Sequence, residues 1–288
     1  GARVTGSDEA VYPPMSEALE GWGITVQEGF RAANVLERTP GPPDCVVIGN
    51  AVRPDNPEAR AVMDTGLPYH SFPDALYEWG VKGRHSVVIT GTHGKTTTTS
   101  LVAFLLDATG RDPSVLVGGI SQDLGGSFRD GSGEHFVIEG DEYDTAFFDK
   151  TPKFLHYHPQ TLVLTSIEFD HADIYRDLEH VKEAFRELIL AMPKDGVVVA
   201  CTSDENVSEV IQDAPCRVIS YSVDSDLSSN WRASQMLSDA DGTVFQLDND
   251  DQSCPVRLPM HGAINVANAL GALAAVESLG VPLQDAVS

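Results

Sequence analysis

The stretch Val87-Val88-Ile89-Thr90-Gly91-Thr92-His93-Gly94-Lys95-Thr96-Thr97-Thr98-Thr99 decides the fold. Apolar, mostly β-branched residues run into a glycine turn, and a Lys-Thr pair then opens an apolar helical segment over residues 100–106. This order of strand, glycine turn and helix N-terminus is the layout of a phosphate-binding loop, in which backbone N–H groups surround an anion. Lys95 supplies a point charge for the β- and γ-phosphates, and the Thr96 hydroxyl is a ligand suited to Mg²⁺. We therefore predict that the chain binds ATP with Mg²⁺.

The loop is shorter than the common form, which has four residues between its first glycine and Gly-Lys. Ile89 occupies the place of that first glycine, and the chain fits Gly-Thr-x-Gly-Lys-Thr-Thr instead. A glycine turn that merely caps a helix is the alternative interpretation. The residues for which we predict contacts to ATP in the loop are Gly91, Thr92, His93, Gly94, Lys95, Thr96 and Thr97.

The charge of the chain excludes some partners. Its 288 residues include 43 Asp and Glu against 19 Lys and Arg, a formal net charge of −24. Such a surface repels nucleic acid and anionic lipid, so we predict neither as a partner. Much of the excess is typical of a solvated surface, as in Asp248-Asn249-Asp250-Asp251.

Other features of the sequence predict a cytoplasmic protein. No run of about 18 apolar residues is present, which argues against a membrane span. The start, Gly1-Ala2-Arg3-Val4, does not resemble a signal peptide. The cysteines are scattered without a Cys-x-x-Cys pair, which is typical of reduced side chains rather than of zinc ligands or a disulfide framework; they are Cys45, Cys201, Cys216 and Cys254.

Alternating strand-like and helix-like segments predict an α/β fold in two domains. Residues 1–82 read as a Rossmann-like domain, with buried parallel strands over 23–26 and 44–49 and helices over 15–20, 57–65 and 73–79. This domain starts as if its first strand and glycine turn were missing, and residues 81–84 read as a linker. Residues 83–288 read as a P-loop-type domain with a mainly parallel sheet and a small antiparallel β portion over 230–260. For this second domain we predict strands over 86–90, 115–118, 135–138, 161–166, 196–200 and 217–221, and helices over 95–109, 178–192 and 266–279.

Acidic side chains follow two of these predicted strands, at the sheet edge where a doubly wound fold places its site. Phe136-Val137-Ile138 leads into Glu139, with Asp141, Glu142 and Asp144 close behind. A carboxylate at the tip of a strand beside a phosphate loop is the expected partner of Mg²⁺. The alternative interpretation is that these carboxylates form an acidic turn exposed to solvent. The strand over 161–166 leads into a second group of possible metal ligands, Glu168-Phe169-Asp170-His171-Ala172-Asp173.

Together these motifs resemble a known family. The Gly-Thr-His-Gly-Lys-Thr-Thr-Thr-Thr loop, Glu139 and Asp170-His171 are similar to the central domain of the Mur ligases, ATP-dependent enzymes that build the peptide of bacterial cell-wall precursors. The first domain resembles the family's domain for UDP-N-acetylmuramate. The motifs that carry this second resemblance are Gly6-Ser7-Asp8, Tyr12-Pro13-Pro14-Met15-Ser16, Gly49-Asn50-Ala51-Val52-Arg53 and Asn56-Pro57-Glu58.

Within the family, the stretch Asp141 to Lys150, with 153–157 and 168–175, favours one branch. It resembles the ligases that join UDP-N-acetylmuramate to the tripeptide L-alanyl-γ-D-glutamyl-meso-diaminopimelate in peptidoglycan recycling. The alternative is the branch that adds free L-alanine in peptidoglycan biosynthesis, which has Ser in place of Tyr143 and a shorter connection to the histidine motif. A non-catalytic binder of nucleotide and UDP-sugar is a further alternative. So is a metal hydrolase built on His156 and His158 with the 170–173 group, although these two histidines are better explained as structural.

The resemblance implies roles for individual residues. Lys95, Glu139 and His171 are implied to be catalytic, with Lys95 holding the phosphates and Thr96, Glu139 and His171 binding metal. Asn265 and Asn268 match a pair that meets the adenine, and residues three apart at a helix start share one face, although helix capping is the alternative. The implied UDP-sugar contacts are Ser7, Asp8, Asn50, Arg53 and Ser71.

The resemblance also implies a mechanism. The lactyl carboxylate of UDP-N-acetylmuramate attacks the γ-phosphorus of ATP, and an amine then displaces phosphate from the acyl phosphate to form an amide. Three departures from the family stand out. Ile264 replaces a common His, and Phe185-Arg186 replaces the lysine that some members carbamylate, so no lysine carbamate is expected. The third departure is that the C-terminal domain that binds the acceptor is absent from this sequence.

Overall fold

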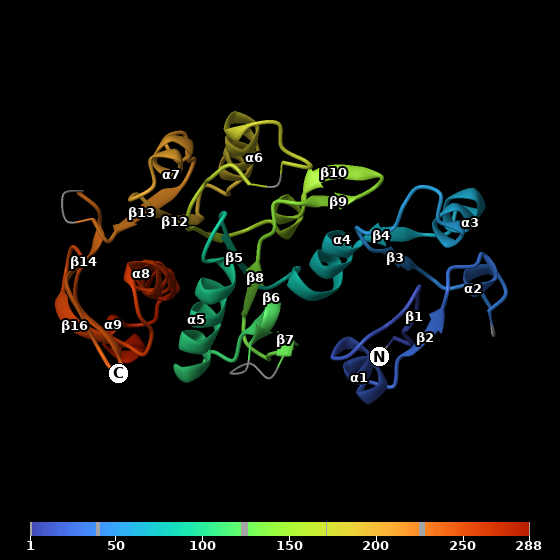
Figure 1. Cartoon of the computed structure of the whole chain (residues 1–288), viewed down its shortest axis with the longest axis horizontal. Coiled ribbons are helices and arrows are strands. Elements are labelled where there is room, and N and C mark those ends of the chain that lie inside the picture. Colours follow the sequence, from blue (N-terminus) through green and yellow to red (C-terminus); the bar gives the residue numbers. More distant parts are fainter. Residues whose placement is uncertain (1, 39–40, 122–125, 171, 225–227, 288) are drawn as a thin grey trace. The chain divides into compact units, whose positions relative to one another are not determined.

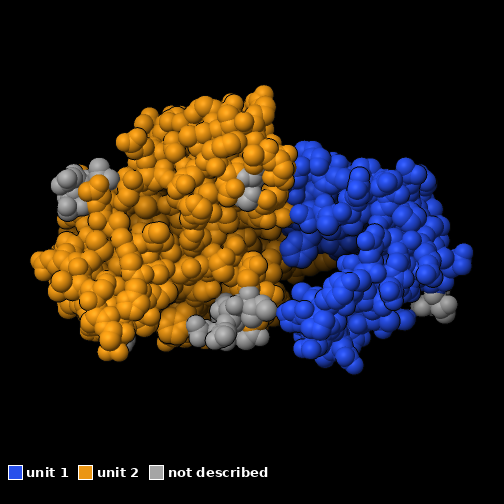
Figure 2. Space-filling model, in the orientation of Figure 1, with its two compact units in different colours: residues 1–75, 144–150 blue, residues 76–143, 151–288 orange. Residues whose placement is uncertain are grey.

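The computed structural model describes residues 2–38, 41–121, 126–170, 172–224 and 228–287 (Figure 1). The chain forms two compact units, which Figure 2 shows in different colours. Unit 1 contains residues 1–75 and 144–150, and unit 2 contains residues 76–143 and 151–288. The domain boundary that the sequence suggests between residues 82 and 83 stays a prediction.

Unit 2 is built on a ten-stranded sheet with the order β16-β15-β14-β13-β12-β11-β5-β8-β6-β7. The run from β14 to β6 is parallel, whereas β15 and β16 at one edge and β7 at the other are antiparallel to their neighbours. The predicted α/β class, with a mainly parallel sheet and an antiparallel portion, is therefore confirmed. The strands are β5 (His85–Thr90), β6 (Ser114–Ser121), β7 (Gly126–Arg129), β8 (His135–Glu139), β11 (Thr161–Leu164), β12 (Val197–Cys201), β13 (Arg217–Ser222), β14 (Trp231–Asp239), β15 (Gly242–Asp248) and β16 (Ser253–Leu258).

Helices cover both faces of this sheet (Figure 1). Helices α5 (Lys95–Ala108) and α8 (Ala263–Ser278) pack on one face, and α6 (Leu178–Leu190) and α7 (Glu205–Val210) pack on the other. Successive residues of a strand point to opposite faces. Val87 and Ile89 accordingly belong to the core under α5 and α8, while Val88 belongs to the core under α6 and α7. Because both faces are buried, these central strands read as unbroken apolar runs. The short α9 (Leu283–Ala286) follows α8.

The strands and long helices predicted for this unit are present with small shifts in their ends. The strand predicted over 161–166 ends at Leu164, because the next two residues leave the ladder and bond to the glycine loop. Helix α7 was not predicted; it is six residues long and starts where the Asp204 carboxylate accepts from the N–H groups of Asn206 and Val207. A cap of this kind stabilises a helix too short to show an apolar period.

Unit 1 holds two separate pairs of parallel strands. β1 (Thr5–Asp8) pairs with β2 (Thr25–Glu28), and β3 (Val46–Ile48) pairs with β4 (Tyr69–Ser71). The prediction that the strands near 23–26 and 44–49 are buried is mostly wrong: Val47 is 43% exposed, whereas Ile48 is 3% exposed. Two-stranded sheets leave both outer edges open, so only part of each strand is covered. The helices are α1 (Met15–Gly21), α2 (Ala33–Leu36) and α3 (Pro57–Thr65), and a hairpin joins β9 (Asp144–Ala146) to β10 (Asp149–Pro152).

The segment predicted as a single helix over 73–79 consists of two consecutive helical elements. Helix α4 (Phe72–Leu76) continues as a π-helical turn, η1 (Tyr77–Val81), and β5 starts four residues later. Val81 is 1% exposed and packs in the core under α6 and α7, so the predicted linker begins inside the packed unit. A 3-10 turn, η2 (Lys153–Tyr157), packs beside β5. Among the described residues, no helix combines the length and the apolar character needed to cross a bilayer.

Two partly or fully buried histidines lie at the start of the central strands. His85 and His135 are register partners on β5 and β8, with ring centroids 5.7 Å apart. Burial lowers the pKa of both imidazoles from the ordinary value of 6.5. His135 is 3% exposed, and its Nδ1 has no hydrogen-bond partner among the described residues. The folded state therefore holds both rings neutral at pH values where the unfolded chain protonates them.

We expect the free energy of unfolding to fall as the pH drops below 6.5, since the unfolded state then binds more protons than the folded state. His135→Gln should flatten this dependence, whatever its effect on stability at pH 7. The exposed His261 offers a matched His261→Gln control, which should keep the wild-type slope. Denaturant titrations between pH 5 and pH 7 measure the effect, and parallel curves for wild type and His135→Gln would contradict it.

Candidate functional site

The predicted phosphate loop lies between the end of β5 at Thr90 and the start of α5 at Lys95. Gly91 and Gly94 have φ angles of 131° and 83°, in the region that favours glycine. No described side chain caps the start of α5, so its first N–H groups stay available to an anion. The backbone N–H of Thr92 donates to the carbonyl of Ser166 at 2.8 Å, and that of His93 donates to the Ser166 hydroxyl at 3.0 Å. The residues after β11 therefore hold the loop in shape.

The two glycines also allow close approach of neighbouring elements. A Cβ at Gly91 would lie 2.3 Å from Thr165 Oγ1, and a Cβ at Gly94 would lie 2.4 Å from Asn268 Oδ1. A Cβ at Gly91 would also lie 2.8 Å from the Ser166 backbone, and a Cβ at Gly94 would require the Asn268 side chain to shift. The loop thus depends on glycine both for its backbone angles and for its packing.

Lys95 is folded inward in this structure. Its Nζ donates to the Gly91 carbonyl at 2.6 Å, lies 3.4 Å from the Thr92 carbonyl, and is 3.1 and 3.2 Å from the two carboxylate oxygens of Glu142. The Lys95 side chain is 15% exposed and that of Glu142 is 3% exposed. The ammonium is therefore placed inside the curve of the loop, where a bound phosphate chain would lie.

Thr96 and Glu139 form a second pair beside the first. The Thr96 hydroxyl donates to Glu139 Oε1 at 3.1 Å, and the Gly118 N–H on β6 donates to Glu139 Oε2 at 2.8 Å. Glu139 is the last residue of β8, which is the strand next to β5. The structure therefore brings together a hydroxyl and a carboxylate, both hard oxygen ligands of the kind that Mg²⁺ prefers.

Glu142 is a residue of the site to which the sequence pattern assigned no role. It lies in the turn after β8, where Thr90 Oγ1 donates to the Gly140 carbonyl and the Tyr175 hydroxyl donates to the Glu142 carbonyl, both at 2.8 Å. Its position three residues after Glu139 was the available signal. A second carboxylate three residues behind the one at the strand end is a candidate partner for the lysine of the loop.

The predicted adenine pair is divided between two environments. Asn268 is 5% exposed and lies against Gly94, so its side chain packs on the loop. Asn265, one turn earlier on α8, is half-buried and donates from Nδ2 to the His261 carbonyl at 2.9 Å. Ile264 beside it is 73% exposed. An adenine contact for these two residues stays a prediction.

The second acidic group lies at the rim of the loop. The Glu168 N–H donates to Thr92 Oγ1 at 2.8 Å, and a Glu168 carboxylate oxygen lies 3.6 Å from His93 Nε2. Asp170 is exposed. The predicted metal ligand His171 lies outside the described residues. Thr97, the last predicted loop contact, is half-buried in the first turn of α5.

The residues predicted to contact a UDP-sugar lie in unit 1. The Ser7 hydroxyl donates to the Glu58 carboxylate, and Asp8 Oδ1 accepts from the Ala10 N–H at 3.3 Å. Ser71 is buried and donates to Asp74 at 2.6 Å. Asn50 and Arg53 are exposed. Their roles stay predictions.

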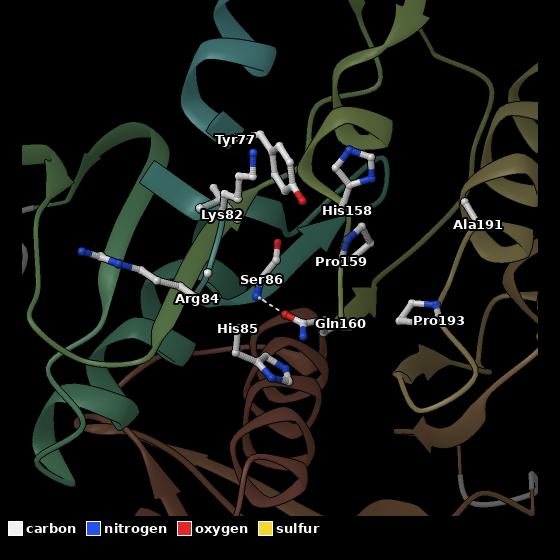
Figure 3. Close-up of a pocket in the computed structure, with 12 residues that line it drawn as sticks. Tyr77, Lys82, Arg84, His85, Ser86, His158, Pro159, Gln160, Ala191 and Pro193 are labelled. Atoms are coloured by element: carbon white, nitrogen blue, oxygen red, sulfur yellow. Dashed lines mark hydrogen bonds between the residues drawn. The ribbon is translucent and has the colours of Figure 1, made fainter. Parts of the chain in front are cut away.

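The most evident cavity of unit 2 lies away from the loop. It has a volume of about 550 Å³ and lies beside the starts of β5 and β11 (Figure 3). Tyr77 and His158 form one wall with ring centroids 4.4 Å apart, Arg84 points away from them, and the Ser86 N–H donates to Gln160 Oε1 at 3.0 Å. Because the loop follows the opposite end of β5, this cavity is separate from the phosphate site.

The histidine pair that suggested a metal hydrolase is also divided. His158 packs on Tyr77, whereas His156 Nε2 is 2.9 Å from Thr151 Oγ1. In the part of the chain that the structure describes, which leaves out residue 171, the two rings thus have different partners, and no cage that uses both is seen there.

Comparison with known proteins identifies the family. Residues 1–80 match the family described as "Mur ligase family, catalytic domain", and residues 89–276 match "Mur ligase middle domain". The chain belongs to the Mur ligase family.

The chain is also similar to individual ligases of this family. A Haemophilus influenzae protein named UDP-N-acetylmuramate–L-alanyl-γ-D-glutamyl-meso-2,6-diaminoheptandioate ligase is 38% identical over 99% of this chain and 61% of its own length. The crystal structure of a ligase with the equivalent name from Neisseria meningitides has a TM-score of 0.89 and 36% identity, covering 98% of this chain and 88% of that one. A UDP-N-acetylmuramate–L-alanine ligase from Acetivibrio thermocellus is 33% identical over 99% of this chain and 58% of its own length. The chain thus spans about three fifths of the length of these curated relatives.

A pair of glycine substitutions tests the packing of the loop. Gly94→Ala should lower the free energy of unfolding by about 2–5 kcal/mol, since it combines a left-handed backbone with a collision at Asn268. Gly83 is a matched control, with a φ of 88° but open space around a Cβ. Gly83→Ala should therefore show only the backbone cost, about 1–2 kcal/mol. Equal losses for the two variants in denaturant titrations would contradict the packing argument.

Proposed function

We propose that the chain is the nucleotide-binding part of a murein peptide ligase. This ATP-dependent enzyme joins UDP-N-acetylmuramate to the tripeptide L-alanyl-γ-D-glutamyl-meso-diaminopimelate in peptidoglycan recycling, in the cytoplasm. The observation that carries the proposal is the 38% identity, over 99% of the chain, to a relative of that name. The arrangement of Lys95, Thr96 and Glu139 around the glycine loop supports it. The activity is proposed for the whole enzyme.

The residues of the loop have distinct tasks in this reaction. The N–H groups at the start of α5 and the Lys95 ammonium bind the phosphates of ATP. They stabilise the charge that moves as the lactyl carboxylate attacks the γ-phosphorus and ADP leaves, which forms the acyl phosphate. Thr96 and Glu139 would hold Mg²⁺, and His171 would complete the metal ligands. The ion supplies further neutralisation of phosphate charge. An amine then displaces phosphate from the acyl phosphate, so no nucleophile from the protein is needed.

The segment after β8 bears on which amine the enzyme accepts. Tyr143, where the L-alanine ligases have Ser, stacks near Lys153, with Nζ 5.7 Å from the ring centroid. The Lys153 N–H donates to the Tyr143 carbonyl, and its Nζ bonds the Asp141 carboxylate at 2.8 Å. The residues that favour the tripeptide branch therefore build the turn that carries Glu142. The biosynthetic L-alanine ligase is the second candidate, supported by the 33% identity of its Acetivibrio thermocellus member.

Each of the two predicted domains has its own ligand in the proposed reaction. Residues 1–82 would bind UDP-N-acetylmuramate with Ser7, Asp8, Asn50, Arg53 and Ser71, and residues 83–288 would bind ATP with Asn265 and Asn268 at the adenine. A non-catalytic binder of the same ligands would share the loop but not the turnover of ATP, so phosphate release discriminates between an enzyme and a binder.

Lysine substitutions test the phosphate site. Lys95→Ala should weaken binding of Mg·ATP by about 1.5–3 kcal/mol, or about 10- to 150-fold, since it removes a charged hydrogen bond. Lys153 is a matched control, because its side chain is also 15% exposed and ion-paired but bonds Asp141. Lys153→Ala should change the affinity by less than about threefold. Isothermal titration of wild type, Lys95→Ala and Lys153→Ala with Mg·ATP measures these affinities. Equal affinities for the three proteins would contradict ATP binding at this loop.

The acceptor is tested by phosphate release from the whole enzyme with UDP-N-acetylmuramate and ATP. With the tripeptide as amine we expect kcat/KM at least about 100-fold above that with L-alanine, because a site built for several polar groups rejects an analogue that lacks them. Faster turnover with L-alanine would assign the protein to the biosynthetic branch.

A further inference from the structure

The contact between Lys95 and Glu142 has a consequence for how ATP enters the site. An ammonium has three N–H donors. In this structure the Gly91 carbonyl, the Thr92 carbonyl and the Glu142 carboxylate lie around Nζ and use all three directions. A phosphate oxygen can bond Lys95 only when one of these partners is given up.

Glu142 is the partner that a phosphate must replace. Gly91 and Thr92 belong to the loop itself, and their carbonyls move only with it. The Glu142 carboxylate, in contrast, carries the same sign of charge as the phosphates and is 3% exposed, so water screens their repulsion poorly. Both groups cannot hold the same ammonium without a large electrostatic cost.

The backbone around Glu142 is fixed, so its release takes place in the side chain. The Gly140 N–H donates to the Ile89 carbonyl at 2.7 Å, and the Tyr175 hydroxyl donates to the Glu142 carbonyl. Asp141 is held by Lys153 Nζ, and the Phe154 N–H donates to the Asp141 carbonyl at 3.2 Å. Rotation of the Glu142 side chain is therefore the movement that frees Lys95, with the turn left in place.

We propose that Glu142 is a positioning residue that holds Lys95 in the nucleotide-free enzyme and competes with the phosphates of ATP for its ammonium. The inference rests on the proposed function and adds a regulation of the same site. The contact keeps Lys95 ordered inside the loop, and it lowers the affinity for any polyanion that fails to displace the carboxylate. If Lys95 is held nine-tenths of the time, the apparent affinity falls about tenfold, since only the competent fraction binds.

The first test measures the contact without nucleotide. Acetylation of lysines by acetic anhydride, followed by mass spectrometry, reports how far each ammonium is protected. Glu142→Gln removes the charge but keeps the shape, and it should raise the labelling rate of Lys95 while Lys153 stays as in wild type. Asp141→Asn is the matched control, because it should raise the labelling of Lys153 and leave Lys95 unchanged. Unchanged labelling of Lys95 in Glu142→Gln would overturn the proposal.

The second test measures the competition. Isothermal titration with Mg·ATP should show Glu142→Gln binding about three- to tenfold more tightly than wild type, a range typical of the weaker couplings between contacting residues. Asp141→Asn removes the same charge one residue away and should bind within about twofold of wild type. Equal or weaker binding by Glu142→Gln, or equal tightening in both variants, would overturn the competition. Absence of binding by wild type would instead overturn the proposed function, while the labelling result would still report the contact.

Discussion

The close approach of backbone to neighbouring elements at Gly91 and Gly94 is the constraint on which the site depends. A Cβ at these residues would lie 2.3 Å from Thr165 Oγ1 and 2.4 Å from Asn268 Oδ1, so these two side chains reach the loop only because both residues are glycine. This contact places the loop at the carboxyl ends of β5, β8 and β11 together. Everything that binds phosphate in the proposed reaction follows from that convergence, because strand ends of a parallel sheet meet at one edge.

The groups proposed to bind phosphate differ in charge from the chain as a whole. A formal net charge of −24 makes the surface unfavourable to polyanions at long range. The phosphate site relies instead on features that act at short range: uncapped N–H groups at the start of α5 and one lysine shielded from solvent. A triphosphate is therefore recognised by geometry rather than by an extended positive field. The 550 Å³ cavity lies where β5 and β11 begin, at the end of these strands away from the loop, so volume alone is a poor guide to this site.

Much of the fold could be predicted from the sequence, and the failures have physical causes. The buried strands of unit 2 were recognisable as apolar runs, and the loop was visible as glycines before Lys-Thr. That Glu139 would lie near the loop was expected because it ends an apolar strand, and its grouping with Thr96 was implied by the family resemblance; the structure places β8 next to β5. The partner of Lys95 could not be found in the same way. Glu142 lies in an irregular turn held by the Tyr175 hydroxyl and by the backbone N–H groups of Lys153 and Phe154, and no periodicity reports contacts of that kind. Asn268 was expected on a shared face with Asn265, but its burial against Gly94 depends on how closely α8 approaches the loop.

One short turn after β8 contacts both of the first two residues of α5. Successive residues of a helix point about 100° apart, and Lys95 and Thr96 bond different carboxylates. Glu139 at the strand tip receives the hydroxyl of Thr96, and Glu142 three residues later receives the ammonium of Lys95. Thr96 and Lys95, which we propose to bind metal and phosphate, are thereby both bonded to the same segment, 139–142. That segment leads into Tyr143, whose carbonyl accepts from the Lys153 N–H. A change in segment 139–142 would therefore act on both of these contacts, to Thr96 and to Lys95, at once.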